Sequence, residues 1–210
     1  MVAGASGLVG HSILQGLLDD PSVGEVHVLA RRDLLVRHPK LTVHQVDFAR
    51  IPPLPAIDEV YLALGTTLRQ AGGRAAFRAV DFDANLAVAK AALLAGAQRI
   101  GLVSAYRADP NSSYFYTRVK GELEQALRLL LPQSLVIARP SFLLGDRTTL
   151  RQPPRPGEKI GIWLSKLLSP VVPTNYRPVE AQCVANALLA TVRQCQGSMI
   201  LLPQDLQHFY

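Results

Sequence analysis

The chain opens on Met1-Val2-Ala3-Gly4-Ala5-Ser6-Gly7-Leu8-Val9-Gly10, a short apolar run followed by three glycines spaced by three. An amphipathic segment over residues 11–18 comes next, so the order predicts a strand, a tight turn and a helix. The first glycine permits a sharp turn, the second leaves the backbone bare for a diphosphate, and the third lets the helix pack closely. The start of the helix then offers N–H groups and partial positive charge to phosphates.

The spacing G-x-x-G-x-x-G differs from the usual G-x-G-x-x-G dinucleotide fingerprint. A glycine turn between a strand and a helix also occurs without any ligand, so the loop indicates a nucleotide only together with further motifs. The apolar run is short for a central strand. Either the strand begins at Met1, or its start is missing.

The composition is that of a single globular domain, with 210 residues of which 49% are hydrophobic and 18% charged. No apolar run approaches the roughly 20 residues that span a bilayer. The chain also lacks the charged head and apolar stretch of a signal peptide at its start. We therefore expect no membrane association and a cytoplasmic location.

The net charge is +6, but the arginines are scattered and do not form the dense, aromatic-interleaved stripe of a nucleic-acid binder. We expect no nucleic-acid partner and, instead, attraction of an anionic cofactor or substrate. Cys183 and Cys195 fall twelve residues apart in one predicted helix, about 18 Å along its axis, which is too far for a disulfide. No metal site is expected, because no further ligand stands beside them.

Beyond the glycine loop, strand-like and helix-like segments alternate, which predicts a parallel sheet with helices on both faces. Residues 48–57 carry three prolines and predict an irregular crossover. The expected strands are residues 25–30, 41–46, 61–64, 100–104, 135–138 and 199–202. The expected helices are residues 75–95 (ended by Gly96), 116–131, 159–168 and 179–194, with a proline-rich loop at 152–157.

This pattern predicts one α/β domain over residues 1–210, a Rossmann-like doubly wound parallel sheet with a small C-terminal cap. Residues 1–145 would form the dinucleotide-binding core. Residues 146–210 would form a small cap on the substrate side, together with the final helix and strand.

Arg31 and Arg32 follow the second predicted strand, where such a fold places the residue that reads the ribose. An acidic residue there would accept from the 2′-hydroxyl of NAD, whereas a guanidinium pairs with a 2′-phosphate. The predicted cofactor is therefore NADP(H), and a solvated basic turn is the alternative. Asp47 and Phe48 follow the third strand, where an adenine would lie.

Leu64, Gly65 and Thr66 end the fourth strand, and the glycine would let the cofactor approach; an ordinary turn is nearly as good an interpretation. Tyr116 and Lys120 stand four apart, which places both side chains on one helix face. A nearby ammonium favours the phenolate, so Tyr116 becomes a candidate acid/base. Ser104, at the end of the fifth strand, is expected to hydrogen-bond a substrate oxygen.

The glycine loop, Ser104, the Tyr116/Lys120 pair and Arg139-Pro140-Ser141 together resemble the short-chain dehydrogenase/reductase superfamily, in its atypical and extended branches. A narrower resemblance, to the HTATIP2-like oxidoreductases and their bacterial relatives, covers most of the chain. It rests on Leu64-Gly65-Thr66-Thr67, Phe77-Arg78-Ala79-Val80-Asp81, Val119-Lys120-Gly121-Glu122 and Arg139-Pro140.

The resemblance implies a Rossmann fold that binds NADP(H) at the glycine loop, through Gly4, Ser6, Gly7, Leu8, Val9 and Gly10, with Arg31 and Arg32 on the 2′-phosphate. It also assigns roles to the later motifs. Tyr116 would be the acid/base, Lys120 would also bind the nicotinamide ribose, and Ser104 would orient the substrate. Arg139, Pro140 and Ser141 would lie at the cofactor, the last two beside the nicotinamide.

Two departures from the superfamily pattern matter. No asparagine matches the fourth member of the catalytic tetrad, and the C-terminal region is short for an extended member. Two functions therefore stay open. One is an NADP-dependent oxidoreductase acting on a small carbonyl or alcohol, and the other is a non-catalytic NADP(H) sensor or scaffold. This superfamily often pairs helices such as 84–94 and 116–131 in dimers, so a homodimer is a candidate assembly.

Overall fold

The computed structural model describes residues 1–144 and 177–210, so the loop expected at 152–157 and the helix expected at 159–168 lie outside the described residues. The described part contains a parallel sheet of seven strands in the order β3-β2-β1-β4-β5-β6-β9. The strands are β1 (Val2–Ala3), β2 (Val26–Ala30), β3 (Leu41–Gln45), β4 (Glu59–Leu62), β5 (Arg99–Val103), β6 (Ser134–Ala138) and β9 (Gly197–Leu201). The α/β class and the doubly wound parallel sheet expected from the sequence are confirmed.

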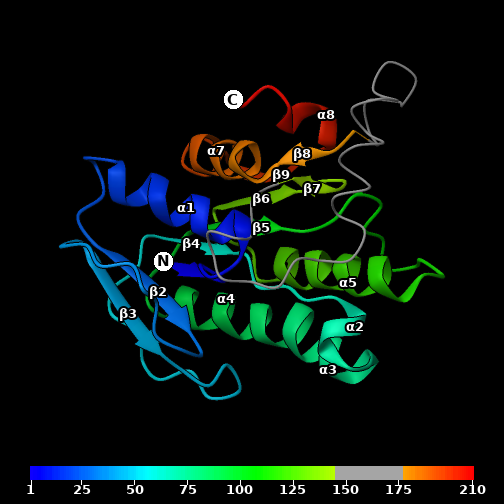
Figure 1. Cartoon of the computed structure of the whole chain (residues 1–210), viewed down its shortest axis with the longest axis horizontal. Coiled ribbons are helices and arrows are strands. Elements are labelled where there is room, and N and C mark those ends of the chain that lie inside the picture. The colour runs from blue at the N-terminus through cyan, green and yellow to red at the C-terminus, as the bar shows by residue number, and fades with distance from the viewer. Residues whose placement is uncertain (145–176) are drawn as a thin grey trace.

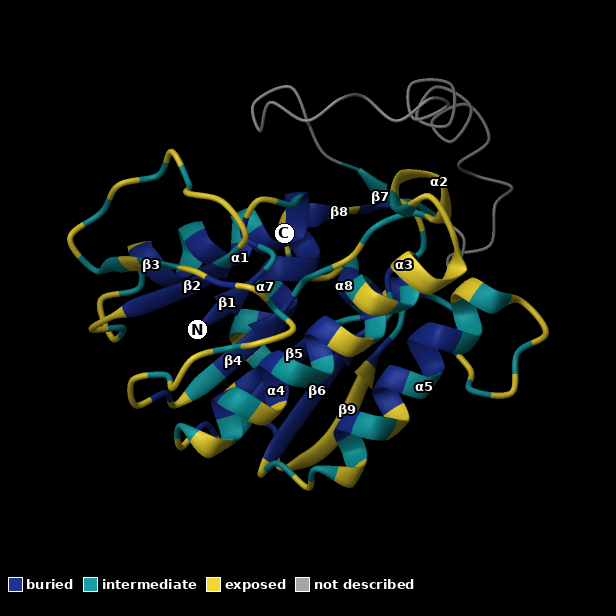
Figure 2. Ribbon diagram, turned by 90° about the horizontal axis from the view of Figure 1, so that it is seen from below, coloured by how far each residue is buried: buried dark blue, intermediate teal, exposed yellow. Residues whose placement is uncertain are grey.

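In the described part of the chain, long helices cover both faces of this sheet (Figure 1). One face carries α1 (Leu8–Asp19) and α7 (Ala181–Val192), and the other carries α4 (Asn85–Leu94) and α5 (Phe115–Leu129). Each face has its own apolar core, and the central strands between them are almost entirely buried (Figure 2). Burial on both faces explains why these strands read as continuous apolar runs.

The short strand β1 lies at the centre of the sheet, between β2 and β4. Val2 pairs with Val28 on one side and with Tyr61 on the other. The chain order reverses across β1 and β4, and ligands of such sheets bind in the crevice at that reversal, beyond the carboxyl ends of the strands. The glycine loop follows β1 directly and so lies at this switch point.

The helical stretch expected over residues 75–95 is not a single α-helix. It consists of α3 (Arg74–Arg78), a π-helical turn η1 (Ala79–Ala84) and α4, and a short helix α2 (Leu68–Ala71) precedes it. Gly96 follows in the left-handed region with φ of 101°, the C-terminal role predicted for it. The π-helical turn carries no sequence signature, because it differs from the α-helix only in hydrogen-bond register.

The described C-terminal residues, 177–210, form part of the sheet and of the helix layer that covers it. Helix α7 packs on α1 and against β5 and β6, while β9 extends the sheet next to β6. Three further short elements are β7 (Leu143–Leu144), β8 (Val179–Glu180), which pairs with it, and α8 (Pro203–Leu206). Residues 145–176, which include most of the expected cap, lie outside the described residues.

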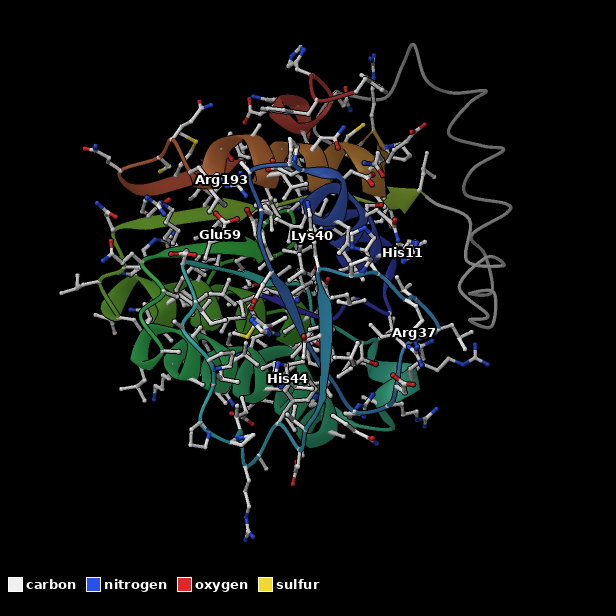
Figure 3. All side chains as sticks on the ribbon, turned by 90° about the vertical axis from the view of Figure 1, so that its left-hand side faces the viewer. His11, Arg37, Lys40, His44, Glu59 and Arg193 are labelled. Atoms are coloured by element: carbon white, nitrogen blue, oxygen red, sulfur yellow. The ribbon has the colours of Figure 1, made fainter. Side chains whose placement is uncertain are left out.

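Polar contacts join distant segments at the amino-terminal edge of the sheet (Figure 3). Arg193, just after α7, binds Asp20 at 2.7 Å and Glu59 at 2.8 Å. Lys40 donates through Nζ to the carbonyls of Leu18 and Asp20, which end α1. A cation at a helix C-terminus is favourable because the last carbonyls lack helical partners. No helix in the described ranges is long and apolar enough to cross a membrane.

Candidate dinucleotide and active site

The first and third glycines of the opening loop are required by packing. Gly4 has a φ of 94°, and a Cβ on it would lie 2.4 Å from the Ala63 carbonyl. A Cβ on Gly10 would lie 2.2 Å from the Gly4 oxygen. A Cβ on Gly7 would meet that same oxygen at an ordinary 3.4 Å. The chain itself therefore leaves Gly7 free of close contacts.

Helix α1 begins directly after this loop without a side-chain cap on its first N–H groups. Gly7 donates its N–H to the Gly4 oxygen at 2.9 Å, which closes the turn, while Leu8 and Val9 bury their side chains in the core. Ser6 is exposed on the turn. Uncapped N–H groups, a positive helix end and a bare Gly7 suit an anionic diphosphate.

The residues expected at the adenosine end lie on the neighbouring strands. Arg31 and Arg32 are exposed just after β2, and Gln45 donates to the Arg31 carbonyl at 3.2 Å. Asp47 is exposed and accepts the Ala49 N–H at 3.0 Å, so one of its oxygens is already engaged. Phe48 packs against the core. Both arginines are therefore exposed at the end of β2, the strand that pairs with β1 ahead of the glycine loop.

Two polar side chains from the next helix hold the Leu64–Thr66 loop. Asp81 accepts the Thr66 N–H at 2.8 Å, and Asn85 donates to the Leu64 carbonyl at 3.1 Å. Both side chains are buried, and both come from the π-helical turn and its junction with α4. A Cβ on Gly65 would lie 3.5 Å from Asp81 and 3.8 Å from Lys120, so this loop rests directly against the Asp81–Lys120 pair.

Tyr116 and Lys120 share a face of α5, as the spacing predicts, but their surroundings differ. Tyr116 is 40% exposed, and its ring contacts Phe77 with 5.6 Å between centroids. Lys120 is 4% exposed, and its Nζ lies 2.8 Å from the Asp81 carboxylate. Burial alone would lower the pKa of the Lys120 ammonium, but Asp81, Tyr116 and Glu124 raise it above its usual value. Lys120 is therefore a buried cation matched by a carboxylate.

Ser104 and Arg139 have a different partner from those expected. The Ser104 hydroxyl donates to Glu124, a fully buried carboxylate on α5. Arg139 binds the same carboxylate through Nε at 2.9 Å and Nη2 at 2.6 Å. In this structure the Ser104 hydroxyl thus donates to a carboxylate with no solvent contact, and its expected role toward a substrate stays a prediction. The same carboxylate holds the Nε and Nη2 of Arg139.

The two residues after Arg139 lie near the same edge. Pro140 is buried and accepts the Tyr106 N–H at 2.8 Å, while the Ser141 hydroxyl donates to the Arg177 carbonyl. Sequence reasoning missed Asp81, Asn85 and Glu124 as site residues. Asp81 stands in a segment that carries the family resemblance, but its pairing with Lys120 depends on the π-helical turn.

Comparison of the whole sequence with known proteins shows the family of this chain. No protein-family model matches the chain. Rat protein HTATIP2 is 32% identical over 212 residues, covering 96% of this chain and 84% of the relative. The mitochondrial protein FMP52 of Coccidioides immitis is 35% identical over 168 residues, covering 71% and 68%. The FMP52 of Saccharomyces cerevisiae, also named mitochondrial, is 32% identical over 162 residues, covering 72% and 68%.

Solved structures agree on the fold. MoeE5, in complex with UDP-glucose and NAD, superimposes with a TM-score of 0.72 at 17% identity, covering 95% of this chain and 74% of that chain. A short-chain dehydrogenase family protein from Francisella tularensis gives 0.67 at 17% identity, covering 95% and 94%. The chain thus has a Rossmann fold like that of short-chain dehydrogenase family proteins. It belongs to the family that includes HTATIP2 and FMP52.

The relatives correct one expectation. A cytoplasmic location was expected because no targeting segment is recognisable in the sequence. The fungal relatives are named as mitochondrial proteins, which points to the mitochondrion instead.

Proposed function

We propose that the protein is an oxidoreductase that uses NADP(H) and interconverts a carbonyl compound and an alcohol. The observation that carries this proposal is the Tyr116/Lys120 pair on α5, at the edge of the sheet where the glycine loop and the Leu64–Thr66 loop also lie. A bound nicotinamide would supply the hydride. Gly4, Gly7 and the start of α1 would hold its diphosphate.

Tyr116 is the residue of this chain that moves a proton. In the reductive direction, its Oη would donate a proton to the carbonyl oxygen, and a nicotinamide bound at the glycine loop would supply the hydride to the carbonyl carbon. Lys120 stays protonated, since Asp81 raises its pKa, and presents a fixed ammonium one turn from Tyr116. Asp81 also accepts the Thr66 N–H, so the same carboxylate contacts both Lys120 and the Leu64–Thr66 loop.

The preference for the phosphorylated cofactor rests on Arg31 and Arg32. Their exposure after β2, beside the glycine loop, suits pairing with a 2′-phosphate. Calorimetric titration with NADPH, NADH and ATP tests this directly. The double change Arg31→Gln and Arg32→Gln should weaken NADPH binding about tenfold or more and leave NADH nearly unchanged. Arg99→Gln, at the start of β5 on the opposite edge, is the control for loss of a positive charge away from the proposed site.

The catalytic role of Tyr116 is tested by Tyr116→Phe in a carbonyl-reduction screen with NADPH. The variant should bind the nucleotide as the parent does and lose about a hundredfold or more in turnover. Unchanged turnover on an accepted substrate would remove the acid/base role from Tyr116.

A non-catalytic NADP(H) sensor or scaffold is the second candidate, and two observations favour it. Asp81 matches the charge of Lys120, and Glu124 engages the Ser104 hydroxyl. Such a protein would bind NADPH without turning over any carbonyl in a broad panel, and its affinity for a partner would change with the nucleotide. A homodimer through α4 and α5 stays a prediction, which light scattering tests.

A further inference from the structure

A cleft of about 740 Å³ opens beside the N-terminal turn of α5. It lies between the segment that follows β5 and the segment that follows β6, at the carboxyl edge of the sheet where ligands of this fold bind. Two of its residues, Tyr114 and Thr117, flank Tyr116 in the sequence. The lining residues that could meet a ligand include Arg107, Asp109, Ser112, Thr117 and Arg139.

One cation in this cleft is held in place by a buried carboxylate. Glu124 binds the Nε and Nη2 atoms of Arg139, and Arg128 lies 3.5 Å from the same carboxylate. Two guanidinium groups therefore share one buried negative charge. The remaining nitrogen of Arg139, Nη1, has no hydrogen-bond partner among the described residues. Glu124 fixes the guanidinium plane through Nε and Nη2, which leaves Nη1 as a charged donor for a carboxylate or phosphate oxygen.

A second cation, Arg107, stands at the rim. It is exposed and has a φ of 60°, a left-handed conformation that non-glycine residues rarely adopt. The opposing charge is Asp109, which accepts the Asn111 N–H at 2.9 Å. Ser112 Oγ and Thr117 Oγ1 lie 2.7 Å apart, and Thr117 also donates to the Tyr114 carbonyl, so these hydroxyl groups hold the loop that lines the cleft.

We propose that this cleft binds the substrate through a carboxylate or phosphate group, with Arg139 and Arg107 as the anion ligands. The inference rests on the proposed function, because it assumes that the reacting carbonyl lies at Tyr116. It narrows the substrate class to anionic carbonyl compounds, and it gives Arg139 a role toward the substrate in place of the cofactor role expected from the sequence.

Matched pairs of substrates test the class. Each carbonyl compound is offered as its free acid and as its methyl ester, for example phenylglyoxylate and methyl phenylglyoxylate, with NADPH and the full chain. The acid should have a kcat/KM at least about tenfold higher than the ester. An ester that is used equally well or better would overturn the inference.

The same pairs separate this inference from the proposed function. If NADPH binds but neither compound of any pair is turned over, the proposed reaction is wrong. Calorimetric titration of both compounds into the NADP⁺ complex then tests whether the cleft binds anions. Binding of the acid but not of the ester would support the anion site without catalysis. Binding of both, or of neither, would overturn it.

Three variants locate the anion site. Glu124→Gln removes the negative charge next to Arg139 and keeps hydrogen-bonding groups, so acid binding should be retained or strengthened. The double change Glu124→Gln and Arg139→Gln should abolish the preference for the acid. Arg107→Gln should reduce it several-fold. If Glu124→Gln alone and the double variant changed the preference for the acid equally, Arg139 would have only a structural role. Near-ultraviolet circular dichroism checks that each variant is folded.

Discussion

At the scale of single residues, the glycine loop separates packing from ligand recognition. Gly4 and Gly10 are needed by the chain itself, because a methyl group on either would overlap a neighbouring carbonyl. Gly7 meets nothing closer than an ordinary contact, so its bare backbone is left for something outside the chain. Steric demand and proposed function are thus divided among three glycines of one motif.

Replacing Gly10 and Gly7 one at a time tests this division. Gly10→Ala should destabilise the fold by about 1–3 kcal/mol, although alanine is the better helix former, because its Cβ would overlap the Gly4 oxygen. Gly7→Ala should change stability by no more than about 1 kcal/mol and weaken NADPH binding about tenfold or more. Urea denaturation and calorimetric titration measure both. Tight NADPH binding by Gly7→Ala would contradict the proposed position of the diphosphate.

Some residue assignments could be reached from sequence and others could not. The glycine loop and the Tyr116/Lys120 face are encoded in local spacing, so they follow from helix geometry. The partner of Ser104 is not local, because it depends on how β5 and β6 present their ends to α5. Nothing in the spacing of Ser104, Glu124 and Arg139 predicts that one buried carboxylate holds both of the others.

At the scale of elements, the π-helical turn η1 decides what surrounds Lys120. It contains Asp81, which is 1% exposed and contacts both Lys120 and the Thr66 N–H. Single π-helical turns inside helices occur frequently at functional sites. The hydrophobic pattern of residues 75–95 predicts a helix correctly but not this register, because a wider turn leaves apolar periodicity almost unchanged.

Asp81→Asn tests how much the Asp81–Lys120 ion pair contributes to the stability of the fold. Lys120 would become a buried cation without a carboxylate, which costs about 3–5 kcal/mol at pH 7. With Asp81 gone, burial lowers the Lys120 pKa below its unfolded value, so the deficit should shrink as pH rises toward about 10. Urea denaturation at pH 7 and pH 9.5 measures the change.

The double variant Asp81→Asn with Lys120→Met is the control for that experiment. Removing both charges should restore most of the lost free energy of unfolding, because an apolar side chain can be buried at this position without a partner. A deficit that is the same at both pH values and in the double variant would show that Asp81 acts through Thr66 and the loop instead of through Lys120.

At the scale of the whole molecule, the two edges of the sheet have separate tasks. The carboxyl edge carries the glycine loop, Tyr116 and the cleft around Arg139, whereas the amino edge carries the Arg193 contacts with Asp20 and Glu59. The parallel sheet with helices on both faces could be predicted from the alternation of elements, because parallel strands need crossover connections that are usually helical. The Arg193 contacts could not, since they join three segments that are distant in sequence.

The final prediction is that the amino edge affects stability without affecting ligand binding. Arg193→Gln should cost about 1 kcal/mol, since the guanidinium is partly exposed and its ion pairs are screened by solvent. NADPH affinity should stay unchanged, because the contacts lie across the sheet from the glycine loop. Lys90→Gln, an exposed position on α4, is the charge control, and any loss of NADPH affinity in Arg193→Gln alone would show that the edges are coupled.

The stability difference between the parent and Arg193→Gln should also depend on pH, in a direction that the Asp20 pKa predicts. Hydrogen bonds from Ser22 and Arg193 lower the pKa of Asp20 to about 2, below the value of about 3.9 in an unfolded chain. A carboxyl group with a lowered folded pKa stabilises the fold above its unfolded pKa and loses that contribution as pH falls through its folded value. The stability difference between parent and Arg193→Gln should therefore hold from pH 7 to about pH 4 and narrow toward pH 2. A difference that grows in acid would contradict the role of Asp20 in this cluster.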